Sequence, residues 1–146
     1  MGRTYRVNAF TRLVNLPFGL LGRLGLGADF RYLLTVRGRR TGRPYSTPID
    51  AIDFEGRRWL VAAYGVTNWV RNLRASGEVE LTRGSRTTRV RAREVSPEEG
   101  AAVLRRYLEL VPVTRPYVDV PPNAPASDFQ RAVRSHPVFE LRAMST

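Results

Sequence analysis

The arrangement of the chain is decided first by residues 33–49, which read LLTVRGRRTGRPYSTPI. An apolar run over 32–36 leads into a polar, glycine-containing turn over 37–43, and residues 45–54 resume with β-branched and aromatic side chains. Apolar runs on both sides of such a turn are typical of two antiparallel strands joined as a hairpin. This stretch therefore predicts the first hairpin of a β-sheet.

The same pattern continues toward the C-terminus. A short turn at 55–57 leads into a strand predicted over 59–64, and the alternating segments 78–82 and 87–95 predict a second hairpin. Residues 138–142 predict a last strand. About six strands in hairpins, without strand–helix–strand alternation or an internal repeat, favour a mainly β, α+β fold: an antiparallel barrel with flanking helices.

Helix start and stop signals predict three helices after the first strands. Asn68 is a candidate N-cap for a short helix over 69–75, which Gly77 ends. Ser96, followed by a proline and two glutamates, opens a longer helix with an apolar stripe. A capping-box pattern at 127–130 opens a last short helix. The five prolines of 111–127 predict a long connection, of the kind that is often functional in a compact domain.

Composition excludes several kinds of chemistry. The chain has 146 residues, a net charge of +11, no Cys and a single His, His136. All 24 basic residues are Arg, which excludes a Schiff-base lysine and a P-loop lysine. The absence of Cys excludes a cysteine nucleophile and a Cys/His zinc site. His136 is the one candidate for a histidine base. An enzyme of this composition must take its reactive chemistry from a bound organic cofactor.

The positive charge predicts a polyanionic partner, which is nucleic acid, an anionic membrane surface or a small ligand with phosphate or carboxylate groups. Without disulfides, a signal peptide or an apolar run of roughly 18 residues, we expect a cytoplasmic protein. We expect one domain over 1–146 with a basic, amphipathic N-terminal segment over 1–28. Residues 5–26 either pack on that domain or lie on the inner face of the plasma membrane.

Two stretches are candidate binding sites. The turn over 37–43 offers four guanidinium groups and the backbone N–H groups of two glycines, which suit phosphate or carboxylate oxygens. Residues 62–69, AAYGVTNW, place small side chains before a helix N-terminus, where a flat ligand could approach the backbone. The alternatives are a solvated hairpin end and an ordinary strand-to-helix turn.

A third candidate is the row of Arg89, Arg91 and Arg93 on one face of a predicted strand, which could follow a nucleic-acid backbone. Residues 78–95 contain no aromatic side chain that could stack on bases, so a solvated face is the competing interpretation. The carboxylates are scattered along the sequence, and no acid–base pair or metal site is predicted from them.

Three motifs in order resemble the deazaflavin (F420)-dependent nitroreductase family. The first is Gly38-Arg39-Arg40-Thr41-Gly42 with Pro48 six residues later. The others are an alanine-containing strand at 60–65 and Trp69 followed by Asn72-Leu73. The resemblance covers about residues 33–75, and the predicted elements continue in the family's order to about residue 141.

The resemblance implies an actinobacterial protein with a split β-barrel fold, related to the pyridoxamine-phosphate-oxidase-like flavin reductases. It also implies that reduced F420 delivers a hydride to an organic acceptor such as a quinone or a nitroaromatic. FMN in place of F420 is the variant that the residues leave open.

The same resemblance implies roles for individual residues. Arg40 and Thr41 would contact the anionic tail of the cofactor, with Arg39 and Arg43 adding positive charge. Residues 45–48 would run beside the ring, 62–64 along the facing strand, and Trp69 and Asn72 would close the cofactor end. The full set of implied cofactor-binding residues is Arg39, Arg40, Thr41, Arg43, Tyr45, Ser46, Thr47, Pro48, Ala62, Ala63, Tyr64, Trp69 and Asn72.

No residue is assigned a catalytic role, and Tyr64 and Tyr117 are the expected contacts to the acceptor. Tyr64 stands where family members place a serine, and the loop after the alanines is shorter than in many of them. These departures motivate a second hypothesis, a non-catalytic protein that binds a lipid, haem or a cofactor at the same site. A nucleic-acid-binding module is the third hypothesis. A homodimer and a membrane contact through residues 5–26 are further partner hypotheses.

Overall fold

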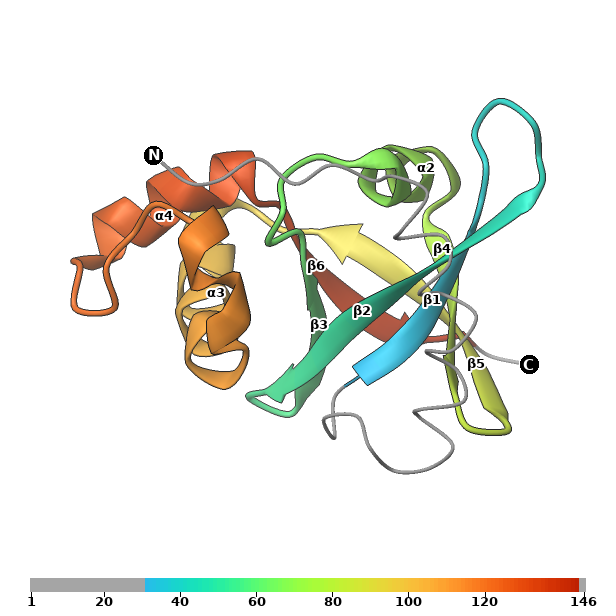
Figure 1. The fold of residues 1–146 in the computed structure, drawn as a ribbon, viewed down its shortest axis with the longest axis horizontal. Helices are drawn as coiled ribbons and strands as arrows, with labels where there is room; N and C mark the ends of the chain where they lie inside the picture. The colour runs from blue at the N-terminus through green and yellow to red at the C-terminus, as the bar shows by residue number, and fades with distance from the viewer. Residues whose placement is uncertain (1–30, 145–146) are drawn as a thin grey trace.

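Six antiparallel strands form a closed barrel in the order β1-β2-β3-β6-β5-β4 (Figure 1). The strands are β1 (Arg31–Arg37), β2 (Pro44–Phe54), β3 (Arg57–Val61), β4 (Glu78–Arg83), β5 (Arg86–Glu94) and β6 (Val138–Ala143). They lie within residues 31–144, which the computed structural model describes. The predicted barrel and its strand number are confirmed, whereas the amphipathic segment predicted over 1–28 lies outside the described residues, and the single domain over 1–146 stays a prediction.

The long strand β2 belongs to two pairings. Residues 44–50 pair with β1, and residues 51–54 pair with β3. Strand β6 then fills the remaining gap, because it pairs with both β3 and β5. The strand predicted over 59–64 is placed too far toward the C-terminus: β3 runs over Arg57–Val61, and the chain turns over 62–65. Pairing with β6 stops there because Pro137, which directly precedes β6, has no N–H to donate.

The helices are α2 (Asn68–Ser76), α3 (Pro97–Leu110) and α4 (Ala126–Ser135), and the 3-10 helix η1 (Pro112–Tyr117) lies in the proline-rich connection. The ends predicted at Gly77 and Ser96 are confirmed: Gly77 adopts φ +74° and donates to Leu73 O, and Ser96 Oγ accepts from Glu99 N at 3.2 Å.

Two predicted N-caps are wrong. The N-cap of α2 is Thr67 instead of Asn68, and its side chain makes no capping bond. Helix α4 begins before the predicted capping box: its N-cap is Pro125, whose ψ of 160° is extended, and no side chain caps the helix there.

The apolar residues form two cores. One fills the barrel and takes side chains from all six strands, including Leu34, Leu60 and Phe139. The other lies between the outside of the barrel and the helices α3 and α4, and includes Ile52 and Phe129. Figure 1 shows α3 and α4 together on one side of the barrel and α2 near the end from which the β1–β2 hairpin projects. No helix among residues 31–144 is long and apolar enough to cross a membrane.

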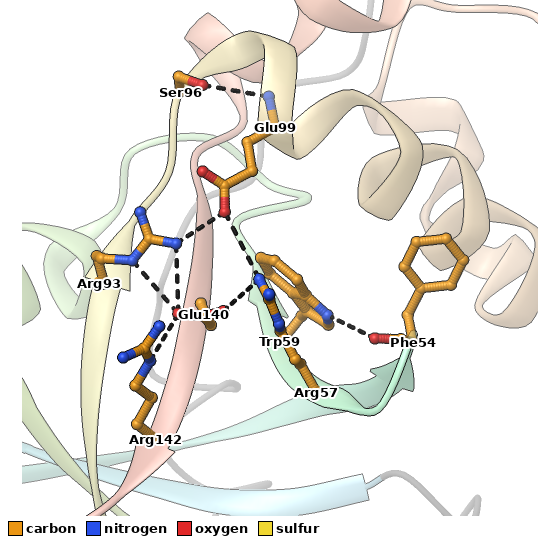
Figure 2. Close-up of polar contacts among 8 residues, drawn as sticks. All are labelled: Phe54, Arg57, Trp59, Arg93, Ser96, Glu99, Glu140 and Arg142. Carbon is orange, nitrogen blue, oxygen red and sulfur yellow. Dashed lines mark hydrogen bonds and ion pairs between the residues drawn. The ribbon is translucent and has the colours of Figure 1, made fainter.

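A buried carboxylate ties the β3–β6–β5 side of the barrel to α3 (Figure 2). Glu140 is 1% exposed and pairs with Arg57 at 2.8 Å, Arg142 at 2.9 Å and Arg93 at 3.3 Å. Glu99, in the first turn of α3, pairs with Arg93 at 2.7 Å. Burial alone would raise the pKa of Glu140. The hydrogen bonds and charges of these arginines, Arg142 first, outweigh burial, so the pKa lies below its usual value.

Candidate functional site

The end of the β1–β2 hairpin is closed by its own backbone. Gly38 N–H donates to Arg43 O at 2.7 Å, and Gly42 N–H donates to Gly38 O at 2.9 Å. Arg37 Nη1 reaches across the loop to Gly42 O at 3.1 Å. Gly42 has a φ of +72°, a backbone conformation that residues other than glycine rarely adopt. The loop therefore has a defined shape although its residues, apart from Gly38, are exposed.

None of the four arginines of this loop forms an ion pair among residues 31–144. The side chains of Arg37 and Arg39 are hydrogen-bonded within the fold, whereas the guanidinium groups of Arg40 and Arg43 are not. Arg40 and Arg43 are exposed, and neither guanidinium forms an ion pair there. Several other arginines differ: Arg31, Arg58 and Arg74, for example, each pair with a carboxylate. A guanidinium is only a donor and matches the geometry of carboxylate and phosphate oxygens. The loop thus concentrates unneutralised positive charge at one end of the barrel.

The hydroxyl of Thr41 is used within the hairpin. Thr41 Oγ1 accepts from Arg43 N at 3.2 Å and lies 3.2 Å from the hydroxyl of Tyr45. Tyr45 is 49% exposed and packs over Gly38, where an added Cβ would lie 2.5 Å from the ring. These contacts hold the two sides of the loop together.

Helix α2 is tied to the arginine loop through Asn72. Asn72 Oδ1 accepts from Arg39 N at 3.0 Å and from Arg39 Nη1 at 2.8 Å. Asn72 is buried, at 5% exposure, and the sequence motif that contains it lies 33 residues from the loop. The structure therefore brings together Arg39 and Asn72, which the sequence analysis had placed in one site.

The N-terminus of α2 carries one orphaned polar atom. Thr67 Oγ1 is buried and has no hydrogen-bond partner among the described residues. Trp69, in the first turn, faces inward and packs on Phe139, with ring centroids 6.1 Å apart. Trp69 thus contributes to the barrel core as well as to the end of the candidate site.

The side chains of 45–48 divide between two faces of β2, because successive residues of a strand point to opposite sides. Tyr45 and Thr47 share the parity of Ile49, which faces the barrel core. Ser46 and Pro48 point outward, and Ser46 Oγ lies 2.7 Å from Thr35 Oγ1 on β1. A ligand on the outer face of the β1–β2 pair would therefore meet Ser46 and Pro48.

The alanines of the second motif lie in the turn that follows β3. Ala62 and Ala63 are 2% and 3% exposed, so both residues are buried, and the N–H and C=O of Ala62 are hydrogen-bonded within the chain. The ring of the next residue, Tyr64, meets that of Tyr117 from η1 edge to face, with centroids 4.7 Å apart. The two tyrosines expected to contact the acceptor are thus in contact with each other, across a long stretch of chain.

Sequence reasoning missed a buried polar group on β2. Asp50, on the outward face of β2, is 6% exposed and forms an ion pair with Arg31. Burial raises the pKa of Asp50, and the hydrogen bond and charge of Arg31 oppose that rise. The pKa of buried Tyr107 is raised by burial, then by the charge of Asp50 and by Tyr64. Alternation along β2 indicates that Asp50 points outward, as Pro48 does. It does not reveal the partner of Asp50, because Arg31 lies 19 residues away in the sequence.

The row of arginines on β5 is largely offset by acidic residues. In the β4–β5 register, Arg91 lies opposite Glu78 and Arg89 opposite Glu80. Arg93 pairs with Glu99 and Glu140. This face therefore lacks the unopposed positive charge that a nucleic-acid backbone requires.

Comparison with known proteins agrees with this architecture. Similar solved structures include an F420-H2 dependent reductase, FDR-A, at 22% identity over 78% of this chain and 95% of that chain, with a TM-score of 0.56. A domain-swapped dimer matches at 20% identity over 92% and 100%, with a TM-score of 0.56. The heme storage protein HutZ from Vibrio cholerae matches at 11% identity over 89% and 90%, with a TM-score of 0.55. Among curated proteins, none matches this sequence.

The closed six-stranded barrel with flanking helices is the split-barrel fold of flavin- and F420-binding proteins. The sequence model of the F420H(2)-dependent quinone reductase family matches residues 10–119, and the chain belongs to that family. It is an oxidoreductase whose cofactor is coenzyme F420, as the resemblance implied. The residues alone had left FMN open as a variant, and the family match favours F420.

Proposed function

We propose that this protein passes a hydride from reduced F420 to a quinone, and that the arginine loop of the β1–β2 hairpin binds the anionic tail of the cofactor. When bound, reduced F420 supplies the hydride. The observation that carries the proposal is the pair of guanidinium groups of Arg40 and Arg43, which have no acidic partner among the described residues. A tail of phosphate and carboxylate groups matches these donors in charge and geometry.

The loop is suited to bind a ligand without first becoming ordered. Its backbone is closed by bonds at Gly38 and Gly42, and Arg39 is held by Asn72. A site that is already in place loses less conformational entropy on binding. Arg39 is thus assigned to support of the loop, whereas Arg40 and Arg43 meet the tail.

The deazaflavin ring is assigned to the outer face of β1 and β2, where Ser46 and Pro48 point outward and Thr35 hydrogen-bonds Ser46. The turn over 62–64 closes this site at the end of β3. The unpartnered Thr67 Oγ1, at the N-terminus of α2, supports a polar ligand group nearby.

The acceptor is assigned to the side of Tyr64 and Tyr117. Two nearly perpendicular aromatic rings in edge-to-face contact offer apolar surface together with two hydroxyl groups, which suits a quinone ring with its two carbonyl oxygens. The chain's residues then orient the acceptor and exclude water. The homodimer and the membrane contact through residues 5–26 stay predictions.

The first experiment is a titration of the protein with F420, followed by cofactor fluorescence at low and moderate salt. We expect R40A/R43A to raise the Kd about tenfold at low salt, equivalent to about 1.4 kcal/mol, and by less at moderate salt. The control R86A/R134A removes the same charge from exposed positions on β5 and α4 and should stay within about twofold of wild type. Equal loss in both variants would show that net charge, instead of the loop, attracts the cofactor.

Turnover separates the reductase from the binding-protein hypothesis. We expect anaerobic oxidation of reduced F420 when a soluble naphthoquinone is added, followed by the absorbance of the cofactor. A nitrobenzene tests the second acceptor class that the resemblance implies. Tight F420 binding without turnover by either acceptor would contradict the proposed reaction and favour a carrier.

A further inference from the structure

The turn that follows β3 is held to β6 through both backbone groups of one residue. Ala62 N–H donates to Pro137 O at 2.8 Å. Ala62 O lies 3.1 Å from Nδ1 of His136. The same carbonyl accepts from Gly65 N at 3.0 Å, which closes the turn itself. The imidazole of His136 and the N–H of Gly65 therefore contact the same atom, the carbonyl oxygen of Ala62.

The β3–β6 register explains why a side chain is needed at this point. Val61 lies opposite Val138, so Ala62 comes opposite Pro137. Residues in a hydrogen-bonded antiparallel pair exchange two N–H···O bonds. The first of these is present, from Ala62 to Pro137. The second cannot form, because proline has no N–H.

The imidazole of His136 supplies the missing donor. A carbonyl oxygen only accepts, so the proton of this contact is on Nδ1. Burial lowers the pKa of His136 and outweighs the backbone hydrogen bonds of Ala62 and Ala63, which act to raise it. The lowered pKa favours the neutral ring. Helix α4 ends just before His136, which brings the ring to the turn.

We propose that His136 is a positioning residue: its Nδ1–H takes the place of the backbone donor that Pro137 lacks, and it holds the turn over 62–65 where that turn borders the cofactor. This inference rests on the proposed function for the assignment of the turn to the cofactor site. The anchoring itself is a property of the chain alone.

Three variants test the proposal. H136F removes the donor and keeps a ring, whereas H136N keeps an N–H at nearly the same distance from the backbone. H136F/P137A restores an N–H on the backbone of residue 137, and P137A alone is its control. The variants are compared by thermal melting, by amide hydrogen exchange at Gly65, and by the Kd and KM for F420.

We expect H136F to speed exchange at Gly65 about tenfold and to raise the Kd and KM for F420 about fivefold, with a smaller change in kcat. H136N and H136F/P137A should each lie within about twofold of wild type. Rescue by either donor separates positioning from a general loss of packing. If H136F does not fold, H136F/P137A still must fold and bind F420 normally.

The proposal is overturned if folded H136F exchanges at Gly65 like wild type, or if H136N is as impaired as H136F. Faster exchange with unchanged F420 affinity, in a wild-type protein that binds F420, would overturn the link to the cofactor site. A wild-type protein that does not bind F420 would contradict the proposed function, while the exchange at Gly65 would still decide the role of His136.

Discussion

Asn72 accepts two hydrogen bonds from Arg39, one from the backbone N–H at 3.0 Å and one from the guanidinium at 2.8 Å. This single oxygen joins α2 to the loop of the β1–β2 hairpin. Asn72 is buried and Arg39 is exposed, so both bonds are partly shielded from bulk water. The position of the arginine loop therefore depends on a residue of a different element.

Replacing Asn72 should loosen the loop. N72A leaves the backbone N–H of Arg39 without its partner, so we expect a loss of about 1–2 kcal/mol in unfolding free energy. Trypsin should also cleave faster after the loop arginines, which can be followed by mass spectrometry. N72D keeps an acceptor oxygen and should keep the loop protected. Equal cleavage of N72A and wild type would contradict this role.

The contact between Gly38 and Tyr45 predicts a specific steric effect. In G38A the new Cβ would lie 2.5 Å from Cε2 of Tyr45 and 2.9 Å from Thr41 Oγ1, so these side chains must shift. We expect a loss of about 1–2 kcal/mol in denaturant unfolding. The double variant G38A/Y45A removes the main clash and should lose less than the sum of the two single variants.

A matched glycine separates this effect from backbone strain. Gly42 has open space around its missing side chain but a φ of +72°. G42A should therefore cost about 1 kcal/mol through conformation alone, and Y45A should not relieve that cost. Relief of G42A by Y45A would show that a general change in the loop, instead of the Gly38 contact, is measured.

Glu140 should make the protein sensitive to acid. Because its pKa is lowered on folding, its contribution to stability is complete above its usual value of 4.5 and is lost as the pH falls through the lower folded-state value. E140Q should lose about 1–3 kcal/mol at neutral pH. The unfolding curves of E140Q and wild type should converge in acid.

The control for Glu140 is Glu98, an exposed residue of the first turn of α3. E98Q should change the unfolding free energy by less than about 0.5 kcal/mol at any pH. A constant difference between E140Q and wild type from neutral to acidic pH would refute the lowered pKa.

The edge-to-face pair of Tyr64 and Tyr117 should couple two distant parts of the chain. A double-mutant cycle with Y64A and Y117A should give a coupling of about 0.5–1.5 kcal/mol in unfolding free energy. Y117A should also raise the KM for the quinone without changing the Kd for F420. A change in F420 affinity alone would move the tyrosines from the acceptor side to the cofactor side.

Most of the barrel could be predicted from the sequence because its hairpins rest on local signals. The turn over 37–43, the end of α2 at Gly77 and the cap at Ser96 each depend on residues a few positions apart. The Asn72 motif could be assigned to the same site as the arginine loop only through the family resemblance. Its contact with Arg39 spans 33 positions, which no local pattern reports.

The errors and omissions have the same origin. The end of β3 is set by Pro137, which immediately precedes β6 far along the chain. The burial of Asp50 and Glu140 depends on arginines from other strands, and alternation alone does not reveal such partners. The N-cap at Thr67 was missed because Asn68 is the better capping residue by type, whereas the structure begins the helix one position earlier.

The order of strands around the barrel also constrains how the chain is made. β6 closes the ring between β3 and β5, yet it is synthesised after every other strand. Until the ribosome has released it, the nascent chain carries two open edges with unpaired N–H and C=O groups. Translation that stops before Val138 would leave a sheet able to pair with a neighbouring nascent chain, so aggregation in the cell should depend on chaperones that cover those edges.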